Sequence, residues 1–312
     1  MQVKCFRMQP FEEFSSFPLI EEEDRSILLQ RECHFGGLFP FMISYYQEGK
    51  GRGCDPNLSL NRICELDEIE KERGENLAEL LLTPADREQV EKSRESYRQL
   101  RALCEKGEAD SMEKEFAELL LSERDFPQEE IAAILEKKEQ AIVHLLALLK
   151  DPFFRDRSAP GYGDGPRFAS YCLGELQVEE SIPLLFELFL EETELDDPER
   201  YYFHPLRKMK AFSRAFLLAQ MKREPISRTN ERAAFLLEEL GEDALIAQDA
   251  LFLLQKVLSC KREPFLLSLI YLCGGLKEEH LQREFALLSD HVRLSPFLQK
   301  EIQGTASCFG VN

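Results

Sequence analysis

The chain has 312 residues, and its 58 acidic and 39 basic residues give a formal net charge of −19. This excess repels phosphate backbones and anionic lipid, so it argues against general nucleic-acid binding and favours basic partners. Apolar residues make up 44% of the chain, which is typical of a globular protein. The longest apolar stretch, 265–276, is shorter than the roughly 18 residues that a transmembrane helix needs, so no membrane span is predicted.

The nine cysteines form no Cys-x-x-Cys pair, which excludes a zinc knuckle and a thioredoxin-like motif. Their scattered, odd-numbered arrangement is typical of a reducing compartment, and we expect a cytoplasmic protein. Acidic residues and prolines within the first twenty positions interrupt any signal-peptide core. No motif calls for a cofactor, and none is predicted.

The first part of the chain is predicted to be a flexible arm, 1–17, followed by an N-terminal helical region, 18–125. Asp24 is expected to cap a helix that Gly36-Gly37 interrupts. A glycine-rich loop, 49–57, then leads into a long amphipathic stretch that begins at Ser59.

Thr83-Pro84 is a strong helix start, because threonine can cap the helix and proline fits its first position. Gly107 is expected to end this helix. Two more helices are predicted, one around 112–121 and one that runs without a break over 128–149.

The second half of the chain repeats itself. The motif that begins Tyr171-Cys-Leu-Gly174 recurs one hundred residues later as Tyr271-Leu-Cys-Gly274, and 233–240 fits the same frame. Units of about 36 to 40 residues with two amphipathic helices cannot bury their apolar faces alone, and stacking buries them.

Residues 167–192 resemble a HEAT-type repeat, most closely the short variety of phycobilin-lyase-like proteins. The resemblance implies that Ala169 and Leu173 pack the first helix, that Gly174 lets helices approach closely, and that Pro183 opens the second helix. The predicted fold class is therefore all-α, an α/α superhelix of HEAT-like helix pairs preceded by the N-terminal helical region. No family resemblance is found for 1–125.

The solenoid is predicted to span 126–304, with insertions at 151–166 and 193–228 and a C-terminal tail at 305–312. The second insertion is expected to contain one extra helix, from about Leu206 to Lys222. Second helices such as 181–192, 243–258 and 278–290 are predicted to line a concave binding surface.

Few residues suggest metal or phosphate chemistry. No His-Glu dipeptide occurs, which argues against the metal site of HEAT-like hydroxylases, and Cys33-His34 with Cys54 and Cys64 match no ligand spacing. The loop 49–53 offers backbone amides and two cations but lacks the ending of a P-loop.

His34, Gly36 and Gly37 form a candidate site of close approach, by a ligand or by a neighbouring helix, because adjacent glycines are costly within a helix. Helix packing is the commoner reason for such a pair.

A basic island, residues 207–232, stands out from the acidic chain. The candidate partner-binding residues are Arg207, Lys208, Lys210 and Arg214, with Tyr201 and Tyr202 just before them. The island either binds an acidic peptide or phosphate, or pairs internally with the acidic run 191–197, and internal pairing is favoured.

The function predicted from these features is a non-enzymatic protein–protein interaction scaffold, since no nucleophile or metal-ligand spacing is present. One alternative is a HEAT-like enzyme of the DNA-base or bilin-lyase type. Another is a chaperone or secretion adapter, which an exposed apolar patch would favour. The expected partner is another protein.

Overall fold

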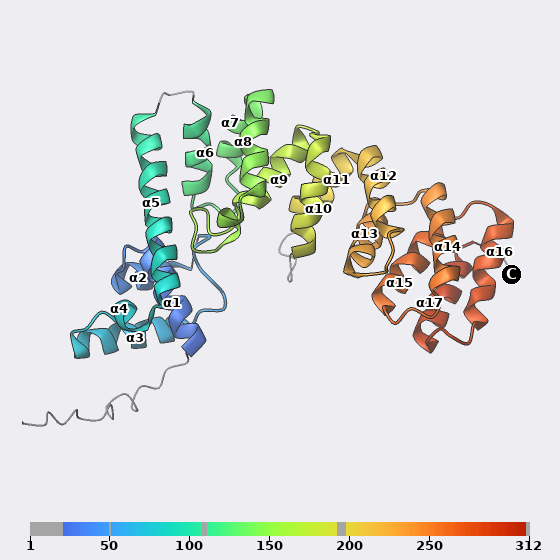
Figure 1. Ribbon diagram of the computed structural model, residues 1–312, viewed down its shortest axis with the longest axis horizontal. Coiled ribbons are helices and arrows are strands. Elements are labelled where there is room, and N and C mark those ends of the chain that lie inside the picture. Colours follow the sequence, from blue (N-terminus) through green and yellow to red (C-terminus); the bar gives the residue numbers. More distant parts are fainter. Residues whose placement is uncertain (1–20, 50, 108–110, 192–197, 310–312) are drawn as a thin grey trace, which may run out of the picture. The chain divides into compact units, whose positions relative to one another are not determined.

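The computed structural model describes residues 21–49, 51–107, 111–191 and 198–309. These residues form seventeen α-helices, α1 to α17, joined by short 3₁₀ and π turns, and no β-strand occurs among them (Figure 1). The fold is all-α, as the sequence predicts. The predicted arm, 1–17, lies outside the described residues.

The chain divides into two compact units. Unit 1 comprises the chain up to Pro127 together with Phe153–Gly163, and unit 2 comprises Gln128–Pro152 and the chain from Asp164 onward. None of the helices in the described ranges is both long and apolar enough to cross a membrane.

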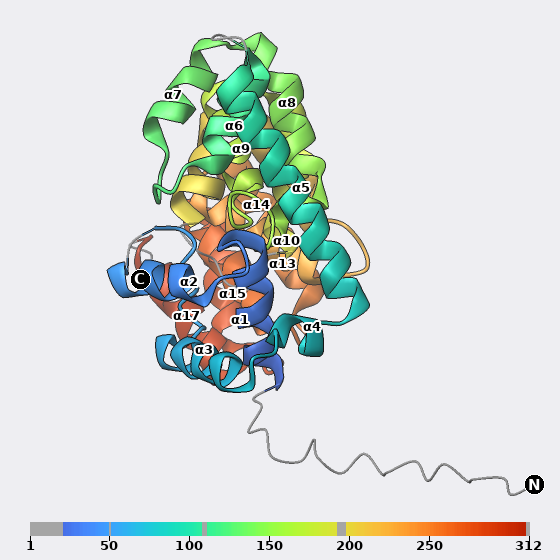
Figure 2. The same ribbon diagram turned by 90° about the vertical axis from the view of Figure 1, so that its left-hand side faces the viewer.

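Unit 1 contains six helices, whose bounds are α1 Glu21–His34, α2 Phe39–Glu48, α3 Leu60–Arg73, α4 Leu77–Leu81, α5 Pro84–Lys106 and α6 Met112–Leu121. Helix α1 packs on α3, α4 and α5, and α5 lies beside α6 (Figure 1, Figure 2). The core is a cluster of buried apolar side chains from α1 to α5, among them Ile27, Met42 and Leu66.

Helix α5 begins where the sequence predicts, after Thr83. The Thr83 hydroxyl accepts a hydrogen bond from the Asp86 amide, and the Asp86 carboxylate accepts one from the Thr83 amide at 2.9 Å. Arg25 of α1 also binds this carboxylate and holds the pKa of Asp86 at about 2. The capping residue Asp86 of α5 therefore also forms an ion pair with α1.

Asp24 does not cap α1, contrary to the sequence prediction. It lies inside the helix, almost fully buried, and accepts hydrogen bonds from Arg62 of α3 at 2.7 and 2.8 Å. A buried carboxylate needs such a partner, because desolvation of an unpaired charge is costly. The partner is 38 positions away in the sequence, so local patterns gave no sign of it.

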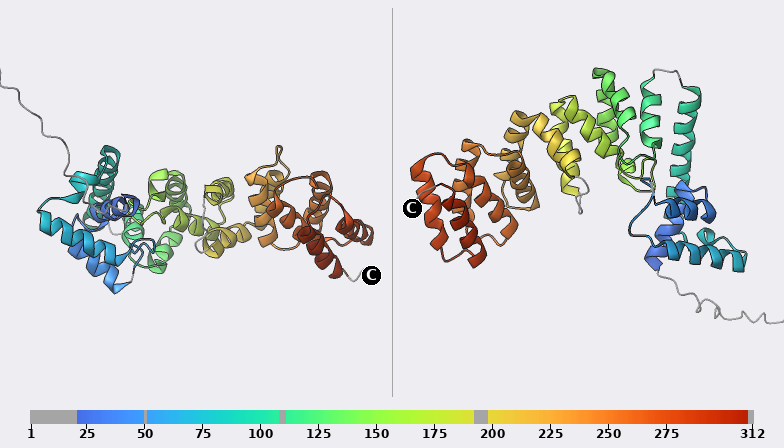
Figure 3. Two further views of the ribbon diagram at one scale, coloured as in Figure 1. Left: turned by 90° about the horizontal axis from the view of Figure 1, so that it is seen from below. Right: turned by 180° about the vertical axis from the view of Figure 1, so that it is seen from behind.

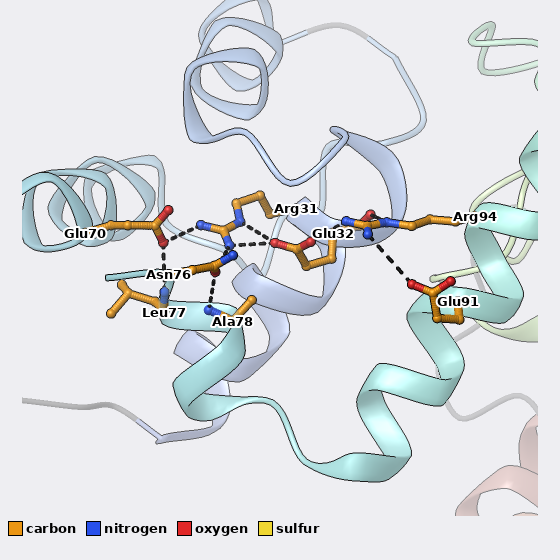
Figure 4. Close-up of polar contacts among 8 residues, drawn as sticks. All are labelled: Arg31, Glu32, Glu70, Asn76, Leu77, Ala78, Glu91 and Arg94. Carbon is orange, nitrogen blue, oxygen red and sulfur yellow. Dashed lines mark hydrogen bonds and ion pairs between the residues drawn. The ribbon is translucent and has the colours of Figure 1, made fainter. Parts of the chain in front are cut away.

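A fully buried arginine, Arg31, links α1 to α3 and α4 (Figure 4). Its guanidinium donates to Glu32 Oε1 at 2.6 Å, to Glu70 Oε2 at 2.7 Å and to Asn76 Oδ1 at 3.0 Å. The Glu70 carboxylate and the Asn76 amide oxygen in turn accept the Leu77 and Ala78 amides at the beginning of α4. Glu32 also binds Arg94 of α5, so one ion-pair network spans four helices.

The segment 153–163, predicted as a long loop between two helices, belongs to unit 1. The Ser158 carbonyl accepts the Ser93 hydroxyl of α5 at 2.6 Å, and the Arg157 side chain pairs with Asp55 at 3.2 Å. These polar contacts hold the segment against α5 and the loop 51–55.

Unit 2 contains the other eleven helices, whose bounds are α7 Gln128–Glu136, α8 Glu139–Lys150, α9 Gly165–Glu175, α10 Ile182–Glu191, α11 His204–Lys208, α12 Lys210–Met221, α13 Arg228–Glu239, α14 Ala244–Val257, α15 Glu263–Leu272, α16 Glu279–Leu287 and α17 Pro296–Ser307. Helix α9 packs on α8 and α11, α13 packs on α12 and α15, and α15 packs on α14 and α17. The helices from about residue 228 onward lie side by side in both views of Figure 3.

Three predicted boundaries in this part of the chain are wrong. The continuous helix over 128–149 is two helices, because Lys138 adopts a left-handed φ of +48° and breaks it. The extra helix expected at 206–222 is also two helices, α11 and α12, which separate at Met209. The predicted tail at 305–312 begins too early, since α17 continues to Ser307.

Gly174 marks a close helix approach. A Cβ added there would lie 2.5 Å from the Pro205 Cα atom, so α9 and α11 meet at this point. The repeated Gly274 differs, because the nearest atom to its Cβ position would be a Thr305 methyl at 3.7 Å. The two copies of the motif therefore share a sequence pattern but not this contact.

We predict opposite effects of alanine at two helical glycines of unit 2. Gly174→Ala should destabilise the unit by about 1–3 kcal/mol, because the backbone of Pro205 cannot move aside cheaply. Gly304→Ala should stabilise it by about 0.5–1 kcal/mol, because no atom lies within 4 Å of the new methyl. Urea unfolding of both variants measures the difference, and equal effects would contradict the close approach.

We also predict that Arg31→Met destabilises unit 1 by about 3–5 kcal/mol, because it leaves buried carboxylate oxygens without their cation. Arg98→Met is the matched control. Arg98 is exposed and pairs with Glu95 at 3.0 Å one turn away, so its loss should cost no more than about 0.5 kcal/mol. Hydrogen exchange of the α1 and α3 amides reports the loss, and similar exchange in both variants would refute this role of Arg31.

Candidate functional site

The basic island joins helices of unit 2 through ion pairs. Arg207 lies 2.5 Å from Glu199 and donates to the Glu239 carbonyl at 3.1 Å, and Lys208 donates to Glu175 at 3.1 Å. These acids come from the π turn before α11, from α13 and from α9. Two of the candidate cations therefore already have carboxylate partners within the chain.

Arg214 closes the end of α13. It binds Asp243 at 2.8 Å and donates to the carbonyls of Gly241 and Glu242 at 2.8 and 2.9 Å. A cation at this position compensates the negative end of the helix and satisfies the carbonyls of the turn that follows it. Lys222 continues the pattern by pairing with Asp249 of α14 at 2.8 Å.

The sequence predicts the acidic run 191–197 as the internal partner of the basic island. Residues 192–197 lie outside the described part of the chain, and the acids that bind Arg207, Lys208 and Arg214 come from other segments. Lys210 is exposed, and the described residues place no carboxylate within ion-pair distance of it.

Tyr201 and Tyr202 are core residues rather than surface residues. They are only 6% and 1% exposed, and the Tyr201 carbonyl accepts the Ser170 hydroxyl at 2.6 Å. Beside them, His204 stacks on Tyr171 and donates from Nε2 to Glu175 at 2.5 Å. The two tyrosine side chains are too deeply buried for a partner to contact in this conformation.

The glycine pair at 36–37 ends α1. Both residues have positive φ, and the Gly37 amide donates to the Arg31 carbonyl at 3.1 Å. A Cβ on Gly37 would lie 2.9 Å from the Glu32 carboxylate, whereas one on Gly36 would meet nothing within 4 Å. The close approach at Gly37 is therefore to the chain's own ion-pair network.

His34 belongs to an aromatic cluster of unit 1. Its Nε2 donates to the Arg157 carbonyl at 2.7 Å, so Nδ1 is the acceptor and takes the Tyr97 hydroxyl at 2.8 Å. The Tyr162 ring lies 4.5 Å from the histidine ring, centroid to centroid. Burial lowers the pKa of His34 to about 4, so the ring is neutral at pH 7.

Glu123 completes this cluster. Its two carboxylate oxygens accept the Tyr45 and Tyr162 hydroxyls at 2.6 and 2.8 Å, and burial raises the pKa of both tyrosines. Each hydroxyl is thus a donor already engaged with an acceptor of the chain. The cluster is suited to holding the segments 51–55, 122–123 and 155–163 together, and it presents no activated nucleophile.

Among the described residues, no group of three or more His, Cys, Asp and Glu side chains is arranged to hold a metal ion. Cys33 is buried, which raises its thiol pKa to about 12. The eight cysteines of the described segments are free thiols.

Helices α14 and α16 correspond to 243–258 and 278–290, which the sequence analysis expects on a binding surface, but their exposed apolar residues were not predicted. Leu245 and Phe252 of α14 are 71% and 58% exposed, and Leu287 of α16 is 73% exposed. We call these three residues, with the polar side chains between them, the α14–α16 face. The spacing of seven between Leu245 and Phe252, on the polar side of an amphipathic helix, was the available signal.

Comparisons with protein-family models, with curated proteins and with solved structures find no match for this chain. The fold defines it as an all-α protein with two compact units.

We predict that His34 makes unit 1 sensitive to mild acid. Its folded-state pKa of about 4 lies below the ordinary value of about 6.5, so the unfolded chain binds a proton that the folded chain does not. Stability should fall from about pH 6.5 to pH 4, by at most about 1.4 kcal/mol per pH unit. Above pH 6.5 both states are neutral and the effect vanishes.

The measurement compares the intact chain with His34→Gln by urea unfolding across this pH range. Carboxylates that titrate near pH 4 affect both proteins alike, so the difference between the two curves isolates the histidine. Parallel curves would contradict a neutral His34 in the folded chain.

Proposed function

We propose that this chain is a non-enzymatic interaction scaffold that binds another protein through unit 2. The observation that carries the proposal is the exposure of Leu245, Phe252 and Leu287 on α14 and α16. Large apolar side chains gathered on one face of a folded domain mark interaction sites more often than isolated ones do.

The organisation of unit 2 supports the proposal. Helices α13, α15 and α17 pack in succession, and their partners α14 and α16 place buried residues such as Leu251 and Phe285 inward. A stack of helix pairs, which we propose to be HEAT-like and superhelical, leaves the outer faces of its second helices available for contacts.

The basic island is a weaker candidate for the binding surface. Arg207, Lys208 and Arg214 are engaged with carboxylates or helix-end carbonyls of the chain. A ligand would have to displace these contacts before it gained new ones, so the island contributes less binding free energy than its charge suggests.

The net charge of −19 fits this role better than nucleic-acid binding, because an acidic surface repels phosphate. We place the scaffold in the cytoplasm, where its free thiols would remain reduced.

The test is capture from a lysate of the native cells with three forms of the whole chain. The form Leu245→Ser/Phe252→Ser removes two side chains of the face without changing charge. The matched control, Val143→Ser/Phe212→Ser, removes exposed apolar side chains of α8 and α12. All four positions are exposed, so the fold should tolerate both forms.

We expect a partner that the intact chain and the control retain and that Leu245→Ser/Phe252→Ser loses. With the purified partner, affinity should fall about tenfold or more for the face variant. Equal binding by all three forms, or substrate turnover that depends on one side chain, would overturn the proposal.

A further inference from the structure

Two parallel hydrogen bonds form a seam between α14 and α16. The Gln248 amide donates to Glu278 at 2.9 Å, and the Gln255 amide donates to Glu284 at 2.8 Å. The two bonds are about two helical turns apart, or roughly 10 Å along α14. Figure 1 shows the two helices beside each other in unit 2.

Most carboxylates around this seam are neutralised. Asp249 pairs with Lys222 at 2.8 Å, Glu242 with Lys277 at 3.3 Å, and Glu279 with Arg283 at 2.5 Å. In each case the cation comes from the chain itself. Exposed pairs of this kind leave little net charge for a partner to recognise.

Glu278 and Glu284 are different, because their hydrogen-bond partners are neutral amides. Within the described ranges, no Lys or Arg nitrogen lies within 4.0 Å of either carboxylate. A glutamine amide orients a carboxylate but does not cancel its charge. Two uncompensated negative charges are thus held at fixed positions along the seam.

Apolar side chains flank these charges. Leu245 and Phe252 project from the outer side of α14, and Leu287 lies one turn beyond Glu284 on α16. Lys256 places its ammonium 4.5 Å from the centre of the Phe252 ring, so the face carries a cation at that border, whereas Lys277 and Arg283 pair with Glu242 and Glu279. The seam itself is acidic with apolar borders.

We infer that the α14–α16 face binds an amphipathic helical segment of another protein that carries lysine or arginine beside its apolar stripe. Apolar residues of such a helix at positions i and i+7 match the spacing of Leu245 and Phe252. Its cations would reach Glu278 and Glu284, so that charge complementarity sets the class of partner. This inference rests on the proposed scaffold function and adds the chemistry of the partner.

The probe is a fluorescein-labelled peptide of about 16 residues, which spans about 24 Å as a helix. It carries leucine at alternating third and fourth positions and lysine on both sides of that stripe. A matched peptide has glutamate in place of every lysine. Fluorescence anisotropy measures the binding of both to the full chain, and the lysine peptide should bind about tenfold more tightly or better.

The two seam carboxylates are tested by Glu278→Gln/Glu284→Gln, which keeps the shape and the hydrogen bonds of both side chains. We expect this variant to bind the lysine peptide about twofold to thirtyfold more weakly, the sum of two exposed ion pairs. The control is Glu180→Gln/Glu187→Gln, which removes the same charge from exposed positions on other elements of unit 2 and should change affinity by less than about twofold.

Phe252→Glu separates docking from general attraction. It makes the protein more negative, so non-specific attraction of a basic peptide would increase, whereas specific binding should weaken about tenfold or more. The inference is overturned if the intact chain does not bind the lysine peptide, if Phe252→Glu does not weaken binding, or if the seam variant behaves like its control.

These outcomes are distinct from those of the proposed function. A captured partner that requires Leu245 and Phe252 but binds Glu278→Gln/Glu284→Gln normally would keep the scaffold and refute the basic partner. If instead capture does not depend on Leu245 and Phe252, the proposed function itself fails, whatever the peptides do.

Discussion

The structure of unit 1 depends on the burial of one positive charge. Arg31 is fully enclosed, and an enclosed guanidinium is tolerable only if its donors are satisfied by carboxylates or other acceptors. Glu32, Glu70 and Asn76 meet that requirement from α1, α3 and the start of α4. The network also requires glycine at position 37, because only a residue without a side chain fits beside Glu32 and Arg94. One charge thereby specifies how four helices and a turn meet.

In unit 2 the ion pairs lie at the surface, between successive helices, whereas the Arg31 network of unit 1 is buried. Arg207 and Arg214 bind the carbonyls and carboxylates at the end of α13, and Lys222 connects α12 to α14. Individually such exposed contacts stabilise little. Repeated between neighbouring helices, they favour one arrangement of those helices, while the buried apolar faces supply most of the stability. Arg207 and Arg214 of the basic island therefore serve the end of α13, and Lys208 and Lys222 pair with carboxylates of other helices.

Much of the helical layout could be predicted from the sequence, because it follows from local chemistry. The Thr83-Pro84 start and the helix at 112–121 depend on residues within one turn, and Gly174 stands out by its place in the repeated sequence motif. The failures involve distant partners or backbone geometry. Asp24 was predicted to be a helix cap because the local sequence does not show its partner, Arg62. The helix break at Lys138 was missed because no glycine or proline stands there. Likewise, no local pattern shows that Ser158 binds Ser93 and brings 153–163 into unit 1.

The candidate site shows why a count of charges is a poor guide to binding. In a chain with 58 acidic residues, most cations find a carboxylate within the chain, and Arg207, Lys208 and Arg214 show the internal pairing that the sequence analysis favours. The more informative distinction is between carboxylates that form an ion pair with a cation and carboxylates that accept a hydrogen bond only from a neutral amide. Glu278 and Glu284 belong to the second class, and they lie beside apolar side chains that folding left exposed. Charge that the fold orients but does not neutralise is available for another molecule, and on the α14–α16 face it is negative.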